Sequence, residues 1–308
     1  MTQININKLE NIEFTFKDKL KNFYISLKEL FRKKWSPSYA FNLTRKGKLI
    51  GHRRAAISFS TYIEKLKNIN KDDLVHDFMK FYTKHWEISR SSWSQDVFAM
   101  YCENRFNLNK KWNLKYLEVG GWDGITSSNT ISLKVERGWG GILIEAEPYS
   151  FYKMALMRKS DKLINAAIVP SGFKSKKVKL LKSDALSGIE GGDGEFGHLD
   201  KETKKHPSFK QSSDNYFIVN TINVNSLLKN EVIDYFSLDI EGLEYEIIKD
   251  LKWKEINKPK IMTIEHNGIK EKKLAINELL TKEGYTEMFS EHCWLTKGDS
   301  WFVLSEII

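Results

Sequence analysis

The stretch from Lys115 to Gly124, with the sequence Lys-Tyr-Leu-Glu-Val-Gly-Gly-Trp-Asp-Gly, decides the fold of this chain. Its mostly apolar first half predicts a short buried strand, and its glycines predict a turn directly after that strand. A helix is expected to follow, with Ser127 or Ser128 as its N-cap. This combination predicts a nucleotide site, because glycines let a ligand approach the backbone and a helix N-terminus presents free N–H groups.

The acidic residue before the glycines indicates which ligand would fit. The spacing Glu118-x-Gly120-x-x-x-Gly124 differs from the Gly-x-Gly-x-x-Gly pattern that binds a dinucleotide pyrophosphate. A carboxylate here would repel a pyrophosphate and attract a ligand with an amino group, such as S-adenosylmethionine. We therefore expect Glu118, Gly120, Gly121 and Gly124 to contact that cofactor. The alternative interpretation is an ordinary strand-to-helix turn in which Asp123 is structural.

The composition bounds the class of protein. The 308 residues, 41% of them hydrophobic, suffice for one large α/β domain with an appendage or for two small domains. Cys102 and Cys293 are the two cysteines, and their wide separation predicts neither a disulfide framework nor a cysteine metal site. No signal-peptide pattern and no apolar run near the roughly 20 residues of a membrane helix are present, so we expect a soluble cytoplasmic protein.

The net charge of +9 is distributed unevenly. Residues 1–112 contain 22 Lys and Arg against 11 Asp and Glu, a net charge of +11. Residues 113–308 contain 27 and 29, a net charge of −2. The part that carries the glycine turn is therefore close to neutral, which argues against a catalytic domain that grips a polyphosphate backbone across its face.

Residues 1–93 are predicted to be a basic, mostly helical extension. Apolar residues recur at helical spacing from Phe16, with lysines mainly on the other side. This helix is expected to pack on the core, or alternatively to contact an anionic membrane surface or a protein partner. The cluster His52-Arg53-Arg54 is either plain surface or a site for an acidic partner. Further helices are expected over residues 57–66, 74–86 and 97–106.

From residue 94 onward the chain is predicted to form one α/β domain, 94–308, with a mostly parallel, doubly wound sheet. Strands are expected over residues 115–119, 141–145, 163–169, 233–239, 260–265, 285–289 and 300–305. Helices are expected over residues 127–137, 149–158, 243–251 and 270–282. Residues 171–215 interrupt the alternation, and the polar, glycine-rich part 187–215 is predicted to be a lid over the acceptor site.

Polar residues follow successive predicted strands, at the edge where doubly wound sheets bind ligands. Glu145 ends the second strand, where a carboxylate can accept hydrogen bonds from a ribose diol. Asn165 and Ala166 end the third, where an amide could read an adenine edge. Asp239 and Glu265 end the fourth and fifth. Each of these has a plain interpretation as a cap or loop residue, but together they predict a site for an adenosine-type ligand.

At these positions the sequence resembles the FkbM-type S-adenosylmethionine-dependent methyltransferases. The resemblance covers about residues 94–304 and is carried by Ser94-Gln95-Asp96, Leu117-Glu118-Val119-Gly120-Gly121-Trp122-Asp123-Gly124 with Ser128-Asn129-Thr130, Arg137-Gly138-Trp139-Gly140-Gly141-Ile142-Leu143-Ile144-Glu145, Ile233-Asp234-Tyr235-Phe236-Ser237-Leu238-Asp239-Ile240-Glu241-Gly242 with Glu244, and Thr263-Ile264-Glu265-His266. The family commonly has alanine or a similar small residue where Gly121 stands. The resemblance implies a class I, Rossmann-like methyltransferase fold. It also implies methylation of a hydroxyl, often on a sugar or secondary metabolite.

With this resemblance we place Asp123, Asn129 and Asp239 among the cofactor-binding residues, beside those named above. A neutral alcohol is a poor nucleophile, so a base or a metal must assist its methylation. Asp239, Glu265 and His266 are the predicted catalytic residues, and they also form a predicted magnesium or manganese site, similar to that of metal-dependent O-methyltransferases. Without a metal, His266 is the expected base. Alternatively, Asp239 and Glu241 cap the next helix and Glu265 is structural.

Two other functions remain open from the sequence. The basic N-terminal part suggests an RNA or other nucleic-acid methyltransferase. Base-methylating enzymes usually have an Asn/Asp-Pro-Pro-aromatic run after the fourth strand, where this chain has Asp239-Ile240-Glu241-Gly242, so nucleic acid is the less favoured acceptor. The other possibility is a nucleotide-binding module without catalysis. The preferred hypothesis is O-methylation of a small-molecule or glycan acceptor, with the oligomeric state left open.

Overall fold

The computed structural model of the chain describes residues 57–69, 73–108, 114–181, 189–190 and 216–308. The predicted basic helix near Phe16, the cluster His52-Arg53-Arg54 and all of the predicted lid except residues 189–190 lie outside the described residues. Within the described part, no helix is long and apolar enough to cross a membrane.

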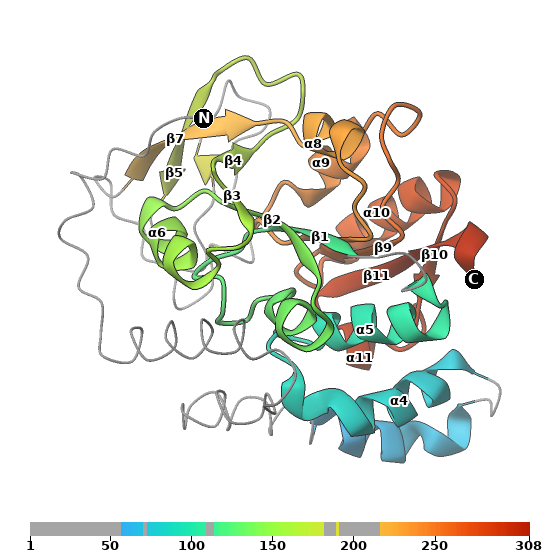
Figure 1. Cartoon of the computed structure of the whole chain (residues 1–308). Helices are drawn as coiled ribbons and strands as arrows, with labels where there is room; N and C mark the ends of the chain where they lie inside the picture. The colour runs from blue at the N-terminus through green and yellow to red at the C-terminus, as the bar shows by residue number, and fades with distance from the viewer. Residues whose placement is uncertain (1–56, 70–72, 109–113, 182–188, 191–215) are drawn as a thin grey trace.

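A seven-stranded sheet forms the centre of the protein (Figure 1). Its strands are β1 (Lys115–Val119), β2 (Gly140–Glu145), β3 (Lys162–Asn165), β8 (Tyr235–Leu238), β9 (Ile261–Glu265), β10 (Tyr285–Met288) and β11 (Asp299–Leu304). The strand order is β10-β11-β9-β8-β1-β2-β3, and the five strands from β9 to β3 run parallel. Helices cover both faces, so the predicted doubly wound, mostly parallel sheet is confirmed.

The last strand, β11, runs antiparallel to both of its neighbours, β9 and β10. Its first residue, Asp299, therefore lies opposite Glu265, the last residue of β9. The start of β11 thus shares an edge of the sheet with the ends of the parallel strands.

Helical segments complete the described fold. The α-helices are one over 57–65, α4 (Leu74–His85), α5 (Gln95–Arg105), α6 (Pro148–Met157), α8 (Asn225–Asn230), α9 (Glu244–Asp250), α10 (Lys270–Lys282) and α11 (Cys293–Thr296). η2 (Leu66–Asn68), η3 (Trp86–Ile88) and η7 (Ser305–Ile307) are short 3₁₀ helices, and η5 (Leu133–Arg137) is a π-helix. α8, α9 and α10 cover one face of the sheet with aliphatic side chains.

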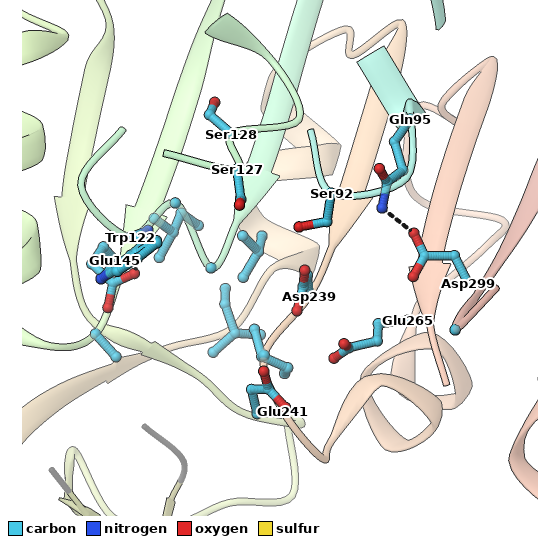
Figure 2. A pocket seen from close by; sticks show the side chains of 18 of the residues that line it. Ser92, Gln95, Trp122, Ser127, Ser128, Glu145, Asp239, Glu241, Glu265 and Asp299 are labelled. Carbon is cyan, nitrogen blue, oxygen red and sulfur yellow. Dashed lines mark hydrogen bonds between the residues drawn. The ribbon is translucent and has the colours of Figure 1, made fainter. Parts of the chain in front are cut away.

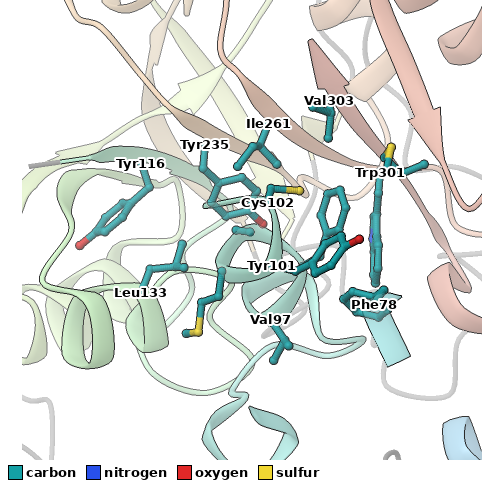
Figure 3. Packing of buried hydrophobic residues seen from close by; sticks show 14 of the residues in the cluster. Phe78, Val97, Tyr101, Cys102, Tyr116, Leu133, Tyr235, Ile261, Trp301 and Val303 are labelled. Atoms are coloured by element: carbon teal, nitrogen blue, oxygen red, sulfur yellow. The ribbon is translucent and has the colours of Figure 1, made fainter. Parts of the chain in front are cut away.

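The other face of the sheet carries an aromatic core (Figure 3). α5 lies between α4 and the sheet (Figure 1), and its Phe98 stacks on Trp301 of β11 with ring centroids 4.7 Å apart. α4 begins at its N-cap Asp73, which accepts a hydrogen bond from the Val75 amide, and it buries Phe78 in the same cluster. Because α4 and α5 share one core, the predicted boundary after residue 93 does not separate two cores.

Two predicted elements differ from the structure. The strand predicted over 163–169 divides at Ala166: β3 stays with β2, whereas β4 (Ala167–Ile168) pairs with a second sheet. The helix predicted over 127–137 begins only near residue 131. Ser127 has left-handed φ (+56°), so it cannot belong to the helix, and Ser128 Oγ accepts hydrogen bonds from the amides of Thr130 and Ile131 as a cap does.

The second sheet is small, with the order β4-β7-β5-β6. Its other strands are β5 (Lys177–Leu181), β6 (Ile189–Glu190) and β7 (Tyr216–Ile222), none of which the sequence pattern predicted. β5 and β7 pair antiparallel and bury Val178, Leu180 and Val219. The segment 171–215, predicted as an interruption, thus contributes β5 and β6 to this sheet.

Candidate functional site

A cavity of about 560 Å³ lies at the edge where the parallel strands end. Its lining comes from the residues after β1, β2, β3, β8 and β9, from the start of β11 and from the segment before α5. Figure 2 shows Glu145 and Trp122 at one end of the cavity, Gln95 and Asp299 at the other, and Asp239 between them. The volume is within the usual range for a small-molecule site, about 300–1,000 Å³.

Backbone strain is concentrated around this cavity. Of the eight described residues other than glycine with left-handed φ, five line it: Trp122 (44°), Ser127 (56°), Glu241 (61°), Asn267 (53°) and Lys297 (57°). Such conformations are costly for residues with a Cβ, and they cluster at ligand-binding and catalytic sites. The strain therefore supports a functional role for the cavity.

The glycine turn after β1 shapes the cavity by close packing. Gly120 has φ +87°, and a Cβ there would lie 1.7 Å from the carbonyl oxygen of Asp239. A side chain would thus separate the ends of β1 and β8. The amides of Gly120 and Gly121 both donate to the Ile144 carbonyl, at 3.0 and 3.1 Å, so these two N–H groups hold the turn against β2.

Glu145 is the acidic residue at the end of β2, and it lines the cavity as the sequence analysis expected. Its two carboxylate oxygens accept hydrogen bonds from the amides of Trp122 and Glu147, each at 2.7 Å. Burial raises the pKa of Glu145 to about 8, although those two amides act in the opposite direction. Each oxygen keeps a second lone pair that can accept a hydroxyl of a ribose.

Glu118 lies away from the cavity, contrary to its predicted contact with the cofactor. It is 2% exposed and faces the α5–α6 side of the sheet, because side chains alternate along β1. It accepts hydrogen bonds from Ser128 Oγ, the Asn129 amide and Thr130 Oγ1, and it lies 3.9 Å from Arg158 Nη1. The carboxylate is therefore an internal anchor for the turn before η5.

Four other predicted cofactor residues also lie outside the cavity lining. Asp123 caps its own turn by accepting from the amides of Ile125 and Thr126. A Cβ on Gly124 would clash with Arg158 and Met154, so this glycine is required by internal packing. The side chains of Asn129 and Asn165 donate to Ser237 Oγ and to the Glu145 carbonyl, respectively. Gly120, Gly121, Ala166 and Asp239 do line the cavity.

Three carboxylates meet at the middle of the cavity. One oxygen from each of Asp239, Glu241 and Glu265 lies within 4.8 Å of the others. Burial raises the pKa of Asp239 to about 6. Burial, together with the nearby Asp239 and Glu241, raises the pKa of Glu265 well above its usual value. Glu265 Oε2 is buried without a hydrogen-bond partner in the described part of the chain, as expected for an atom that binds a ligand or cation.

The loop that carries Glu241 is held by a residue outside the cavity, Glu244. Its fully buried carboxylate accepts from the amides of Ile240 and Gly242 and pairs with Lys272 Nζ at 2.5 Å. These contacts stabilise the left-handed φ of Glu241. Glu244 therefore positions one member of the acidic group.

The side chains that converge at the middle of the cavity include Glu241 and do not include His266. His266 is 3% exposed and does not line the cavity, and its Nδ1 accepts a hydrogen bond from the Gly268 amide. Burial lowers the pKa of His266, which disfavours the charged form of the ring. Among the described residues, the acidic side chains that converge closely enough to hold a metal ion together are Asp239, Glu241 and Glu265, and His266 is not one of them.

Sequence reasoning missed several residues of the cavity, namely Ser92, Gln95, Trp122, Ser127, Glu241, Lys297 and Asp299. Gln95 belongs to the Ser94-Gln95-Asp96 motif, but no role was assigned to it. Gln95 is held at the cavity by its neighbour Asp96. The Asp96 carboxylate accepts hydrogen bonds from the hydroxyls of Ser89 and Ser91 and from the Arg90 amide, and it so fixes the segment before α5. Asp299 was missed because only the ends of strands were considered, whereas β11 is antiparallel and begins at the cavity.

The chemistry of the lining fits S-adenosylmethionine, a cation with an adenine, a ribose diol and an ammonium group. Five carboxylates and one lysine line the cavity, which favours a cationic ligand. Apolar residues at the Glu145 end, Ile144, Ala166, Ile168 and Leu180, suit the faces of an adenine ring. Glu145 is placed beside them for the ribose hydroxyls.

Comparison with known proteins agrees with this geometry. The sequence profile described as the methyltransferase FkbM domain matches residues 118–287, which is more than half of the chain and includes the ends of β1, β2, β8 and β9. Neither the curated proteins nor the solved structures contain a significant match. The family implies a methyltransferase that uses S-adenosylmethionine. On this match and the Rossmann-like sheet that carries it, the chain belongs to the FkbM methyltransferase family.

Proposed function

We propose that the protein is an S-adenosylmethionine-dependent O-methyltransferase whose acceptor is a hydroxyl of a sugar, a glycan or a related metabolite. The observation that carries this proposal is the acidic group of Asp239, Glu241 and Glu265 at the middle of the cavity. It lies between the Glu145 end, which suits the cofactor, and the Asp299 end, which is left for an acceptor (Figure 2).

The cofactor half of the cavity is the part over β1, β2 and β3. Glu145 would accept the ribose hydroxyls, and the apolar residues Ile144, Ala166 and Ile168 would enclose the adenine. Asp239 lies beside the glycine turn, where its carboxylate would attract the cationic end of the cofactor. When bound, the cofactor supplies an activated methyl group, so the protein mainly has to align the acceptor and remove its proton.

Proton removal is the task that we assign to the acidic group. A neutral alcohol needs a base, and a base is most effective when its pKa lies near the working pH. Burial brings the pKa of Asp239 to about 6, close to neutrality. Asp239 is therefore the proposed base, with Glu265 beside it to share or relay the proton.

The same three carboxylates could alternatively hold a divalent cation. Their oxygens lie within 4.8 Å of one another, and oxygen donors alone favour magnesium, with manganese also possible. The unpaired, buried Glu265 Oε2 fits this role. A bound cation would lower the pKa of an acceptor hydroxyl and remove the repulsion between the carboxylates.

A methyl-transfer assay tests the proposal. Purified protein is incubated with S-adenosylmethionine carrying an isotope-labelled methyl group and with either a set of glycosides or a mixed RNA. Label transferred to a glycoside oxygen is the expected result, since the acidic cavity would repel a polyphosphate. Label on RNA bases would contradict it. Binding of S-adenosylhomocysteine, measured by calorimetry, verifies that the preparation is folded and competent.

A further inference from the structure

Asp299 and Gln95 form a buried pair at the end of the cavity opposite Glu145 (Figure 2). Gln95 Nε2 donates to Asp299 Oδ2 at 2.5 Å, and the two residues are 2% and 7% exposed. Gln95 Oε1 accepts from the Trp93 amide at 2.8 Å, which orients the side-chain amide so that its NH₂ group faces Asp299. One oxygen of Asp299 is thus held by the protein.

The bond to Gln95 engages only Oδ2 of Asp299, and the side chain lines the cavity, where the indole of Trp301 also acts on its carboxyl group. A carboxyl group that is more than nine-tenths buried and still lines a cavity, with one oxygen fixed by a neighbouring amide, is well placed to bind a polar group of a ligand. Asp299 is therefore a binding group whose partner comes from the cavity.

Asp299 lies on the far side of Asp239 from the strands that form the cofactor half. In the sheet order, β11 is two strands from β8 and three from β1. With neighbouring strands about 5 Å apart, the backbones of Asp299 and Asp239 are separated by roughly 10 Å. Glu265 lies one strand from Asp299, directly opposite it in the register. The acceptor must therefore bridge from the acidic group to Asp299.

A hydroxyl of the acceptor is the group best suited to form a hydrogen bond with the Asp299 carboxyl. It can donate to the ionised carboxylate or accept from the protonated one, so it fits either protonation state. Ser92 and Trp93 line the same end of the cavity, and Lys297 Nζ lies 5.5 Å from the centroid of the Trp93 ring. This combination of hydroxyl and aromatic groups suits a polyhydroxylated molecule.

We propose that Asp299, oriented by Gln95, binds a second hydroxyl of the acceptor, close to the one that is methylated, and so selects polyols. This inference rests on the proposed O-methyltransferase function. It assigns Asp299 to acceptor specificity and leaves methyl transfer to the acidic group.

The Asp299→Asn variant tests this assignment because it inverts the polarity presented to the acceptor. The NH₂ group of Gln95 requires an oxygen, so the new side-chain amide would turn its own NH₂ group toward the cavity. Methyl hexopyranosides and their singly deoxygenated analogues serve as acceptors. For the wild type, removal of the hydroxyl beside the methylated one should lower kcat/KM by about 10- to 100-fold. In Asp299→Asn this difference should shrink to less than about threefold.

Two further variants make the result specific. Gln95→Met removes the group that orients Asp299 and should reduce the discrimination in the same direction. Asp234→Asn is the matched control, because Asp234 is also buried but lies at the opposite edge of the sheet, paired with Lys260. It should keep the discrimination of the wild type. All variants should bind S-adenosylhomocysteine within about twofold of the wild type, since Asp299 is outside the cofactor half.

The outcomes separate this inference from the proposed function. The role of Asp299 would be overturned if Asp299→Asn discriminated between the glycoside and its deoxygenated analogue as strongly as the wild type does. A large loss of S-adenosylhomocysteine affinity in that variant would also overturn it. Neither result would affect methyl transfer by the wild type. If the wild type binds S-adenosylhomocysteine but methylates no hydroxyl acceptor, the proposed function fails, and the inference fails with it.

Discussion

The carboxylate of Glu118 lies 3.9 Å from the guanidinium of Arg158, and both side chains are buried beneath the turn that follows β1. Arg158 also donates to Asp161, to Tyr116 Oη and to the Gly124 carbonyl. The acidic residue of the fold-defining stretch is thus paired inside the protein, and it cannot serve as the group that attracts the cofactor.

This pairing predicts that Glu118→Ala lowers stability far more than cofactor affinity. Glu118 accepts hydrogen bonds from three buried donors, and each donor left without an acceptor costs about 1–3 kcal/mol, whereas Arg158 stays paired with Asp161. Urea unfolding should show that loss, whereas calorimetry with S-adenosylhomocysteine at low temperature should give nearly the affinity of the wild type. A large affinity loss with unchanged stability would restore Glu118 to the cofactor site.

Glu145→Ala should have the opposite effect and weaken S-adenosylhomocysteine binding. Loss of one partner of a buried hydrogen bond costs roughly 1–3 kcal/mol, and two bonds to the ribose would be lost, so a loss of at least about tenfold in affinity is expected. Glu147→Ala is the matched control, since Glu147 caps α6 and does not line the cavity. Equal affinities for Glu145→Ala and the wild type would refute the ribose assignment.

Glu244→Gln should slow methyl transfer without a comparable loss of cofactor affinity. The substitution removes the buried charge that pairs with Lys272, and it weakens the hold on the Ile240 and Gly242 amides. Glu241 would then leave its left-handed backbone conformation more readily. Kinetics should show a lower kcat, and an unchanged kcat would mean that the loop is held by other contacts.

The buried carboxyls of the cavity predict that stability falls as pH rises. The pKa values of Asp239, Asp299 and Glu145 are raised to about 6, 7 and 8, so the folded state binds these protons more tightly than the unfolded chain. The resulting stabilisation is complete below about pH 4 and is lost as pH rises through 6 to 8, by up to about 1.4 kcal/mol per pH unit and group.

Glu145→Gln should flatten this dependence between pH 6 and 8, because one of the three groups no longer ionises. The free energy of unfolding of the cofactor-free protein is measured by urea unfolding in chelator at several pH values. Parallel pH profiles for the variant and the wild type would show that Glu145 ionises equally easily in the folded and unfolded states.

The sequence predicted the sheet and much of the cavity because parallel strands end at one edge. Glu145, Asp239 and Glu265 each follow an apolar strand, and all three line the cavity. Glu118 was misplaced because it lies within β1, where alternation directs its side chain to one face of the sheet. Asp299 could not be found in this way, because the direction of β11 depends on tertiary pairing.

Local signals also failed where tertiary contacts override them. The helix expected from residue 127 starts later because Glu118 takes the Asn129 amide and Ser127 adopts left-handed φ at the cavity. His266 follows a strand and could titrate near neutrality, yet its ring is buried away from the acidic group. When two adjacent residues at the end of a strand are both polar, the sequence does not show which of the two side chains faces the cavity.

We propose that Asp239 and its acidic neighbours drive methylation of an acceptor hydroxyl beside a separately bound cofactor. The most direct measurement is transfer of a labelled methyl group to glycoside acceptors by the wild type and by Asp239→Asn, each in magnesium and in excess chelator, with S-adenosylhomocysteine binding measured in parallel. We expect label on oxygen for the wild type and at least about a hundredfold slower transfer by an Asp239→Asn variant that still binds the cofactor. Loss of wild-type activity in chelator would assign the acidic group to a cation, and full activity would assign Asp239 as the base. Transfer at the wild-type rate by Asp239→Asn would contradict the account.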